Sequence, residues 1–209
     1  MKLLVFGASG QTGKELIRQG VALQHDVTAF VRQPAKLGPL AASVRIVQGN
    51  VVDDAAVASA VAGQDAVVST LGTGTSLKHD ADLIVGVQHI IRAMQAHQVR
   101  RLIYMSFIGV HESRAAVGVI LRYVATIPLR HQIADHEAKE ALVQASPLDW
   151  TIVRPPTLTN GPRTGRYRSG TAITTWSPVP LLARADVADF ILRELAQPHF
   201  IRQAPRLLP

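Results

Sequence analysis

The chain of 209 residues has no cysteine, and aromatic residues account for only 5% of it. The absence of cysteine excludes disulfide bonds, thiol nucleophiles and thiolate metal ligands. Because hydrophobic residues nevertheless make up 47% of the chain, we expect an aliphatic core of alanine, valine, leucine and isoleucine. Such a core is typical of parallel strands that are covered on both faces.

Long hydrophobic runs are also missing. No uncharged apolar stretch approaches the roughly 18 residues that a membrane-spanning helix requires. Met1 leads directly into a short apolar segment, without the pattern of a secretory signal peptide. These absences predict a soluble cytoplasmic protein, and the length predicts one domain that spans residues 1–209.

Acidic residues are fewer than basic ones, which gives a net charge of +7. The basic residues are mostly arginines scattered along the chain, with no block of like charges and no interleaving of aromatic and basic residues. A positive surface and an anionic cofactor account for this balance better than nucleic acid does. We therefore expect no nucleic-acid partner. The histidines lack the spacing of metal ligands, so we also expect no bound metal.

A glycine-rich turn follows the first apolar run, Met1–Phe6, and leads into a helix-forming stretch. A strand, a tight turn and a helix in this order form the phosphate cradle of dinucleotide-binding folds. In such a cradle Gly7 allows the turn, Gly10 allows close approach of a pyrophosphate, and Gly13 allows helix and strand to pack closely. The residues expected to bind the dinucleotide here are Gly7, Ser9, Gly10, Gln11, Thr12 and Gly13. The alternative is a glycine-rich turn without a ligand.

Apolar runs alternate with segments of helical periodicity along the whole chain, which is typical of repeated βαβ units. The predicted strands are Lys2–Phe6, Asp26–Val31, Val44–Val47, Ala66–Thr70, Arg101–Ser106 and Trp150–Arg154. The predicted helices are Thr12–Gln19, Asp54–Val61, Asp80–His97, Arg130–Gln144 and Asp186–Ala196. Right-handed crossovers between these strands predict an α/β fold with a doubly wound parallel sheet of order 3-2-1-4-5-6, the Rossmann arrangement.

Two charged residues are expected to have structural roles. Asp186 is positioned to cap the last predicted helix. Arg154 precedes a proline, so its backbone is expected to be extended, and its side chain is expected to pair with a helix carboxylate.

The segment Ile108–Leu129 interrupts the alternation of strands and helices with an additional apolar stretch. It is interpreted as a lid over the ligand cleft, an oligomer contact or extra core, and core packing is the favoured interpretation.

The second predicted strand ends at Arg32, with Lys36 one turn beyond. NAD-binding folds usually place an acidic residue near this strand end, where it accepts hydrogen bonds from the ribose 2′-hydroxyl. A guanidinium suits a 2′-phosphate instead, so the sequence favours NADP(H) over NAD(H). The alternative is a solvated surface arginine.

Two more loops follow predicted strands at the edge of the sheet where ligands collect. Asn50 and Val51 are expected beside the adenine, although a turn and a helix cap would account for the same residues. Leu71, Gly72 and Thr73 follow the fourth strand, where the strand order reverses, and they are expected to contact the cofactor. An ordinary flexible loop is the alternative there.

Several stretches together resemble the atypical short-chain dehydrogenase/reductases, in particular the NmrA-like group and the small NADPH-dependent flavin reductases of the biliverdin-IXβ reductase type. These stretches are Gly7–Gly13, Val31–Arg32, Ser69–Thr73, Leu102–Ser106, Leu148–Pro156, Asn160–Tyr167 and Arg184–Ala188. The resemblance runs nearly from end to end. It implies a single NAD(P)-binding Rossmann domain with an acceptor site built from loops at the carboxyl ends of the strands.

One departure from the wider superfamily bears on the chemistry. Its ordinary members use a Tyr-x-x-x-Lys pair to protonate a carbonyl oxygen, but no tyrosine in this chain is followed by lysine four residues later. The usual sites are expected to hold Gln132 and His136. Hydride addition to a ketone requires a positioned acid, which typically accelerates the reaction ~10²–10⁴-fold. Hydride addition to a conjugated ring depends mainly on stacking and on the distance between the donor and acceptor atoms.

The sequence therefore predicts an NAD(P)H-dependent reductase that acts on a small planar acceptor such as a flavin or quinone, as a monomer or small homo-oligomer. The alternative implied by the NmrA-like resemblance is a redox sensor that binds NADP(H) and signals through partner contacts without turnover. An isomerase or epimerase that retains its nucleotide is a third hypothesis.

Further candidate site residues follow the fifth and sixth predicted strands. Ser106 is expected to contact the nicotinamide and, with His136, is a candidate catalytic residue, although both side chains have structural alternatives. Phe107 is expected either to stack on a planar acceptor or to pack in the core. The remaining candidates are Pro155 at the cofactor and Pro156 and Thr157 in the wall of the substrate pocket.

Overall fold

The fold is built on one six-stranded parallel sheet with the strand order β3-β2-β1-β4-β5-β6. It is seen in a computed structural model that describes residues 1–72, 81–116 and 130–209. The order reverses between β1 and β4, as it does in doubly wound folds. The predicted fold class and strand order are therefore confirmed.

The strands of the sheet are β1 (Lys2–Phe6), β2 (Asp26–Val31), β3 (Arg45–Gln48), β4 (Ala66–Ser69), β5 (Arg101–Met105) and β6 (Asp149–Val153). The helices are α1 (Gln11–Ala22), α2 (Asp54–Val61), α3 (Ala81–Ala96), α5 (Arg130–Ala145) and α6 (Arg184–Ala196), with the short helices η1 (Pro34–Ser43) and η2 (His111–Ala116). Every predicted strand and helix is present, with bounds that differ by at most three residues.

Two small ribbons complete the fold. Strand β7 (Thr157–Thr159) pairs with β9 (Leu181–Ala183), and β8 (Arg168–Gly170) pairs with β10 (Arg206–Leu208). These strands are three residues long, too short for the sequence pattern to indicate.

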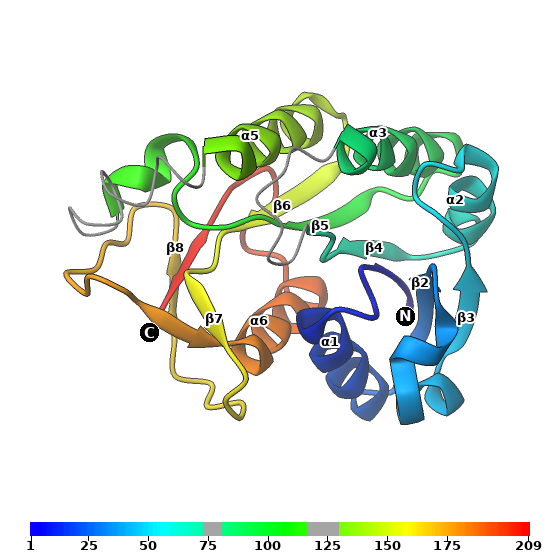
Figure 1. Cartoon of the computed structure of the whole chain (residues 1–209), viewed down its shortest axis with the longest axis horizontal. Coiled ribbons are helices and arrows are strands. Elements are labelled where there is room, and N and C mark those ends of the chain that lie inside the picture. The colour runs from blue at the N-terminus through cyan, green and yellow to red at the C-terminus, as the bar shows by residue number, and fades with distance from the viewer. Residues whose placement is uncertain (73–80, 117–129) are drawn as a thin grey trace.

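The helices cover both faces of the sheet: Figure 1 shows α2, α3 and α5 along one face and α1 and α6 along the other. Side chains alternate between these layers along each strand. In β1, Leu3 and Val5 pack with α1 and α6, whereas Leu4 and Phe6 pack with α2, α3 and α5. The strand is an uninterrupted apolar run because both of its faces are buried.

The outer edge of β6 is covered by the segment that leads into β10. The backbone N–H groups of Ile152 and Arg154 donate to the carbonyl oxygens of Gln203 and Pro205 at 3.0 and 2.9 Å, and Leu207 donates back to Arg154 at 3.1 Å. This late segment therefore lies alongside the last strand of the sheet.

Arg154 and Glu140 join β6 to α5 through a buried ion pair. Nε and Nη2 of Arg154 donate to the two carboxylate oxygens of Glu140 at 3.1 and 2.6 Å, and the two side chains are 1% and 0% exposed. A further hydrogen bond runs from Nη1 to Glu112 in η2. The prediction that Arg154 pairs with a helix carboxylate is confirmed.

The prediction that Asp186 caps the last helix is wrong. The helix begins at Arg184, and Ala183 occupies the capping position without a side-chain hydrogen bond. The buried Asp186 carboxylate instead accepts hydrogen bonds from the N–H groups of Thr164 and Gly165, at 2.7 and 2.8 Å. Because these donors come from a loop distant in sequence, the local pattern gave no sign of them.

The segment Ile108–Leu129 is described only as far as residue 116, so its interpretation as lid, interface or core lies largely outside the described residues. Its first part does pack inward, since Ile108 and Val110 are 8% and 0% exposed. Within the described residues, no helix is both long and apolar enough to span a membrane.

Candidate functional site

Two adjoining cavities lie at the carboxyl ends of the strands, where the order of the sheet reverses. We call them the β2-side cavity, of about 310 Å³, and the β5-side cavity, of about 420 Å³. They share Gly10, Thr70, Leu71 and Gly72, which follow β1 and β4. This crevice is where doubly wound folds bind their ligands.

Most of the predicted site residues line these cavities. Those in the β2-side cavity are Gly7, Ser9, Gly10, Arg32, Asn50, Val51, Leu71 and Gly72. Those in the β5-side cavity are Gly10, Gln11, Thr12, Gly13, Leu71, Gly72, Ser106, Phe107, Gln132 and His136. Thr73 lies outside the described residues.

The glycine turn leaves no room for a side chain at Gly7 or Gly13. Gly7 has a φ of +74°, and a Cβ there would lie 2.7 Å from the carbonyl group of Thr70. A Cβ at Gly13 would lie 2.4 Å from the carbonyl oxygen of Gly7 and 2.8 Å from Cα of Ala8. The turn at Gly7 and the close helix packing at Gly13 are therefore as predicted.

The N-terminus of α1 offers unpaired hydrogen-bond donors. Gly10 occupies the capping position without a side-chain cap, and the first N–H with a partner in the helix is that of Lys14, which donates to Gly10. No residue in the described part of the chain accepts a hydrogen bond from the N–H of Gln11, Thr12 or Gly13. Free donors at the positive end of a helix dipole fit a pyrophosphate.

The Arg32 guanidinium lies in the β2-side cavity with no competing partner. Its side chain is exposed and forms neither a hydrogen bond nor an ion pair with any described residue. The helix cap expected in the neighbouring loop is supplied by Asp53, which accepts a hydrogen bond from the N–H of Ala56 at 3.1 Å. Asn50 and Val51 line the cavity next to this cap.

Ser106 and His136 meet at the wall of the β5-side cavity. Oγ of Ser106 lies 3.3 Å from Nδ1 of His136, and the Phe107 ring packs edge-on against the imidazole with centroids 4.9 Å apart. Strand β5 ends just before Ser106, whose N–H donates to the carbonyl of Val153 at 2.8 Å. Gln132, one turn earlier in α5, lies on the same face of the helix and also lines this cavity.

Burial lowers the pKa of the His136 imidazole to about 3, with a further lowering by the Lys139 ammonium and an opposing effect of Asp135. The ring is therefore neutral at neutral pH. A neutral imidazole donates one hydrogen bond and accepts one, and its tautomer decides which nitrogen does which. Hydrogen bonding with Ser106 is open to it, whereas general-acid chemistry from an imidazolium is not.

The described tyrosines do not face the site. Burial, together with the nearby Glu140 carboxylate, raises the pKa of Tyr104, which is only 1% exposed. Burial and a 2.8 Å hydrogen bond to Asp189 raise the pKa of Tyr167. Neither side chain lines either strand-end cavity.

Three candidates after β6, Pro155, Pro156 and Thr157, line neither of these two cavities. Pro155 and Pro156 are buried, and the carbonyl of Pro155 accepts a hydrogen bond from the N–H of Ile108 at 2.8 Å. Thr157 is exposed at the start of β7. The β5-side cavity is lined from that direction by Leu158 and Arg184, which the sequence analysis missed because no local motif marks them.

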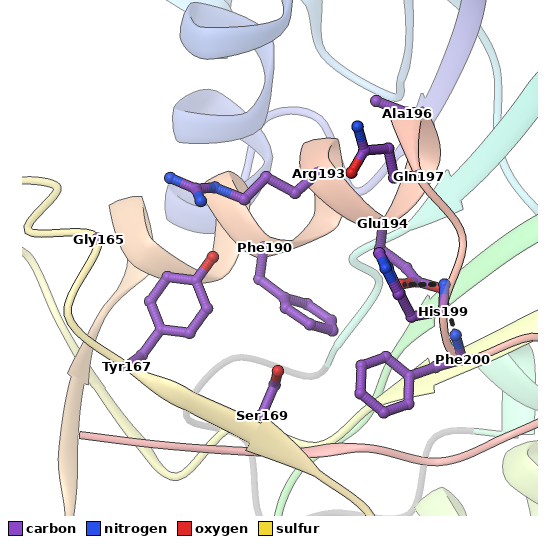
Figure 2. Close-up of a pocket in the computed structure, with 10 residues that line it drawn as sticks. All are labelled: Gly165, Tyr167, Ser169, Phe190, Arg193, Glu194, Ala196, Gln197, His199 and Phe200. Carbon is purple, nitrogen blue, oxygen red and sulfur yellow. Dashed lines mark hydrogen bonds between the residues drawn. The ribbon is translucent and has the colours of Figure 1, made fainter.

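A third cavity, of about 630 Å³, lies away from the glycine turn, between α6, the turn that follows it and residues 165–169 (Figure 2). Tyr167, Phe190 and Phe200 form its apolar wall. The Glu194 carboxylate at its edge accepts hydrogen bonds from the backbone N–H groups of His199 and Phe200 (Figure 2). The same carboxylate also accepts a hydrogen bond from the Arg101 side chain. Within the described residues, no cluster of side chains suits a metal ion.

Comparisons with known proteins agree with this geometry. A family model described as NAD(P)H-binding matches residues 7–198. An uncharacterized sugar epimerase of Bacillus subtilis, YhfK, is 28% identical over 201 residues, which covers 93% of this chain and 88% of the relative.

Solved structures share the fold at lower identity. ChuY, an anaerobillin reductase from Escherichia coli O157:H7, has a TM-score of 0.82 and 23% identity, covering 100% of this chain and 97% of its own. A short-chain dehydrogenase/reductase from Veillonella parvula in complex with NADP has a TM-score of 0.81 and 18% identity, and the match covers 100% of this chain and 94% of that structure's chain.

Proposed function

The chain belongs to the NAD(P)H-binding family, and on that premise we propose that it is an NADPH-dependent reductase of flat, conjugated acceptors such as flavins or quinones. One observation carries the proposal. Beside the glycine turn, the β5-side cavity is walled by Ser106, Phe107 and a neutral His136, and neither described tyrosine faces it. This wall suits hydride transfer to a ring better than protonation of a ketone.

The residues of the glycine turn would hold the cofactor. The free N–H groups of Gln11, Thr12 and Gly13 are positioned to donate to the pyrophosphate. Asn50 and Val51 would lie beside the adenine, and Leu71 and Gly72 would pass close to the middle of the dinucleotide. When bound, the nicotinamide supplies the hydride.

Arg32 would select NADPH over NADH. A guanidinium with no partner among the described residues is free to bind a 2′-phosphate through two parallel hydrogen bonds. The ribose 2′-hydroxyl of NADH needs an acceptor, which an arginine does not provide.

On the acceptor side, the chain has to orient a planar molecule and exclude water. The edge-on packing of Phe107 against His136 keeps the phenylalanine ring fixed at the cavity wall, where a planar acceptor would contact it. Ser106 would donate a hydrogen bond to a carbonyl or ring nitrogen of the ligand while His136 orients its hydroxyl. A strong acid is not needed, because a conjugated ring spreads the charge that it gains.

The test is oxidation of NADPH by the purified chain with FMN or menadione as acceptor. Turnover well above the uncatalysed background supports the proposal. Tight NADPH binding without turnover would instead favour a redox sensor. A nucleotide retained through purification and returned to its starting redox state after each turnover would favour an epimerase, the activity named for YhfK.

A further inference from the structure

We propose that Arg184 recognises an anionic substituent, a phosphate or carboxylate, on the acceptor. The inference rests on the proposed function and adds a substrate class to it. Arg184 begins α6 and lines the β5-side cavity together with Ser106, Phe107 and His136. Its side chain is half-buried, so its charge is less screened by water than that of a surface arginine.

The cavity carries a single formal charge among its described lining residues, and that charge is on Arg184. None of these described residues is a carboxylate, and His136 is neutral because burial lowers its pKa to about 3. The remaining lining side chains are apolar or uncharged amides and hydroxyls. An anionic group that entered this cavity would therefore meet one cation with no carboxylate among the described lining residues to compete for it.

The guanidinium is oriented without being neutralised. Nη1 of Arg184 donates to Oδ1 of Asn160 at 2.7 Å, and the side chain makes no other hydrogen bond or ion pair with the described residues. An amide oxygen holds the planar group in place but carries no formal charge. The free donors of the guanidinium can then form the paired hydrogen bonds that phosphate and carboxylate favour.

The surroundings of Arg184 fix it relative to the glycine turn. The carbonyl of the next residue, Ala185, accepts a hydrogen bond from the Gln19 side chain of α1 at 2.9 Å. The buried Asp186 holds Thr164 and Gly165, in the loop that carries Asn160. A cation anchored in this way is preorganised for one anion position.

The cofactor pyrophosphate offers the same anionic chemistry, since Gln11, Thr12 and Gly13 line the same cavity. Those three residues already provide free N–H donors for it. Arg184 lines the cavity together with the proposed acceptor wall as well, so we assign it to the acceptor. The experiment distinguishes an anion on the acceptor from the pyrophosphate of the cofactor.

The experiment compares FMN with riboflavin, which share one ring system and differ by one phosphate. KM and kcat for each flavin are measured with saturating NADPH, and Kd for NADPH is measured separately. The wild type is expected to show a KM for FMN roughly tenfold below that for riboflavin. Arg184→Gln should remove this difference by raising the KM for FMN alone, with kcat and the Kd for NADPH little changed.

Three further variants sharpen the comparison. Arg184→Lys keeps the charge and should restore part of the preference for FMN. Asn160→Asp places a carboxylate against the guanidinium and should weaken FMN in the same manner as Arg184→Gln. Arg166→Gln removes an exposed positive charge that lines none of the three cavities, and it should change neither KM.

Equal KM values for the two flavins in the wild type would overturn the proposal, and so would a change confined to NADPH affinity. Turnover of riboflavin with no discrimination between the flavins would leave the reductase assignment standing while removing this inference. Should no flavin turn over, quenching of flavin fluorescence by the NADP-saturated protein gives the same comparison as a ratio of Kd values. An equal Kd for FMN and riboflavin would then reject the role of Arg184.

Discussion

Oγ of Ser106 lies 3.3 Å from Nδ1 of His136, which joins the end of β5 to the middle of α5. The contact places two uncharged hydrogen-bonding groups at the wall of the β5-side cavity. Gln132, the other expected replacement of the Tyr-x-x-x-Lys pair, faces the same cavity. The described part of this wall therefore carries hydrogen-bonding groups but no strong proton donor.

Replacing the hydroxyl at this wall should have a small effect on turnover. Ser106→Ala is expected to reduce kcat for a flavin by less than about tenfold, because loss of a needed general acid typically costs ~10²–10⁴-fold. Steady-state oxidation of NADPH measures it. Tyr104→Phe is the control, since the Tyr104 hydroxyl is buried without a hydrogen bond and lines neither strand-end cavity. A loss of a thousandfold in Ser106→Ala would show that the serine delivers a proton.

Arg32→Ala should weaken NADPH binding by about 1.5–3 kcal/mol, roughly ten- to a hundredfold, because one charge-assisted contact with the 2′-phosphate is lost. NADH binding should hardly change. Calorimetric titration with both coenzymes tests this, with Arg45→Ala as the control because Arg45 is an exposed arginine on β3 that lines neither strand-end cavity. Equal losses for both coenzymes would refute the assignment.

Gly13→Ala should destabilise the fold and abolish coenzyme binding together. The new Cβ would lie 2.4 Å from the backbone oxygen of Gly7, which cannot move without opening the turn. We expect the free energy of unfolding in urea to fall by about 1–3 kcal/mol. Gly20→Ala is the matched change in the same helix, where a Cβ would meet only side-chain atoms, the nearest at 3.3 Å. Similar losses in both variants would contradict this account.

The lowered pKa of His136 predicts a dependence of stability on pH. Between the pKa of about 3 in the folded chain and the ordinary value of about 6.5, only the unfolded chain binds the proton, so stability falls as the pH falls through this window. At about pH 5 the loss amounts to about 2 kcal/mol.

His136→Gln should remove this part of the acid sensitivity, which urea unfolding at about pH 5 and about pH 7 would measure. His97→Gln, at an exposed position, should retain it. If wild type and His136→Gln lose equal stability on acidification, the imidazole is not held neutral in the folded chain.

Glu140→Gln should reduce the free energy of unfolding by about 3 kcal/mol or more, because it removes one charge of a buried pair and leaves the Arg154 guanidinium poorly compensated. Glu15→Gln breaks the exposed pair between Glu15 and Arg18 and should cost at most about 1 kcal/mol. Equal effects in urea unfolding would mean that Glu112 alone compensates Arg154.

The fold and the residues of the glycine turn could be placed from the sequence because their signals are local. Gly7, Gly10 and Gly13 lie within one turn, and the alternation of apolar runs with helical segments leaves few topologies once crossovers are right-handed. Arg32 could be located because it directly follows a predicted strand. For each of these residues, the strand, turn or helix that contains it is enough to place it at the crevice.

The wall of the β5-side cavity formed by Leu158 and Arg184 depends on partners that are distant in the chain. Arg184 reaches the β5-side cavity because α6 packs beside α1, and Asn160 orients it from another loop. Asp186 has the residue type of a helix cap, yet it is buried within the first turn of the helix and binds that loop instead. No window of sequence contains both members of such a pair.

The segment over the outer edge of β6 has a consequence for synthesis. A ribosome completes Asp149–Val153 well before it adds Gln203, Pro205 and Leu207, whose backbone satisfies that edge. During elongation the nascent sheet has an unsheltered border able to pair with another growing chain. Truncation ahead of Gln203 would make that exposure permanent, and we expect the shortened chain to aggregate.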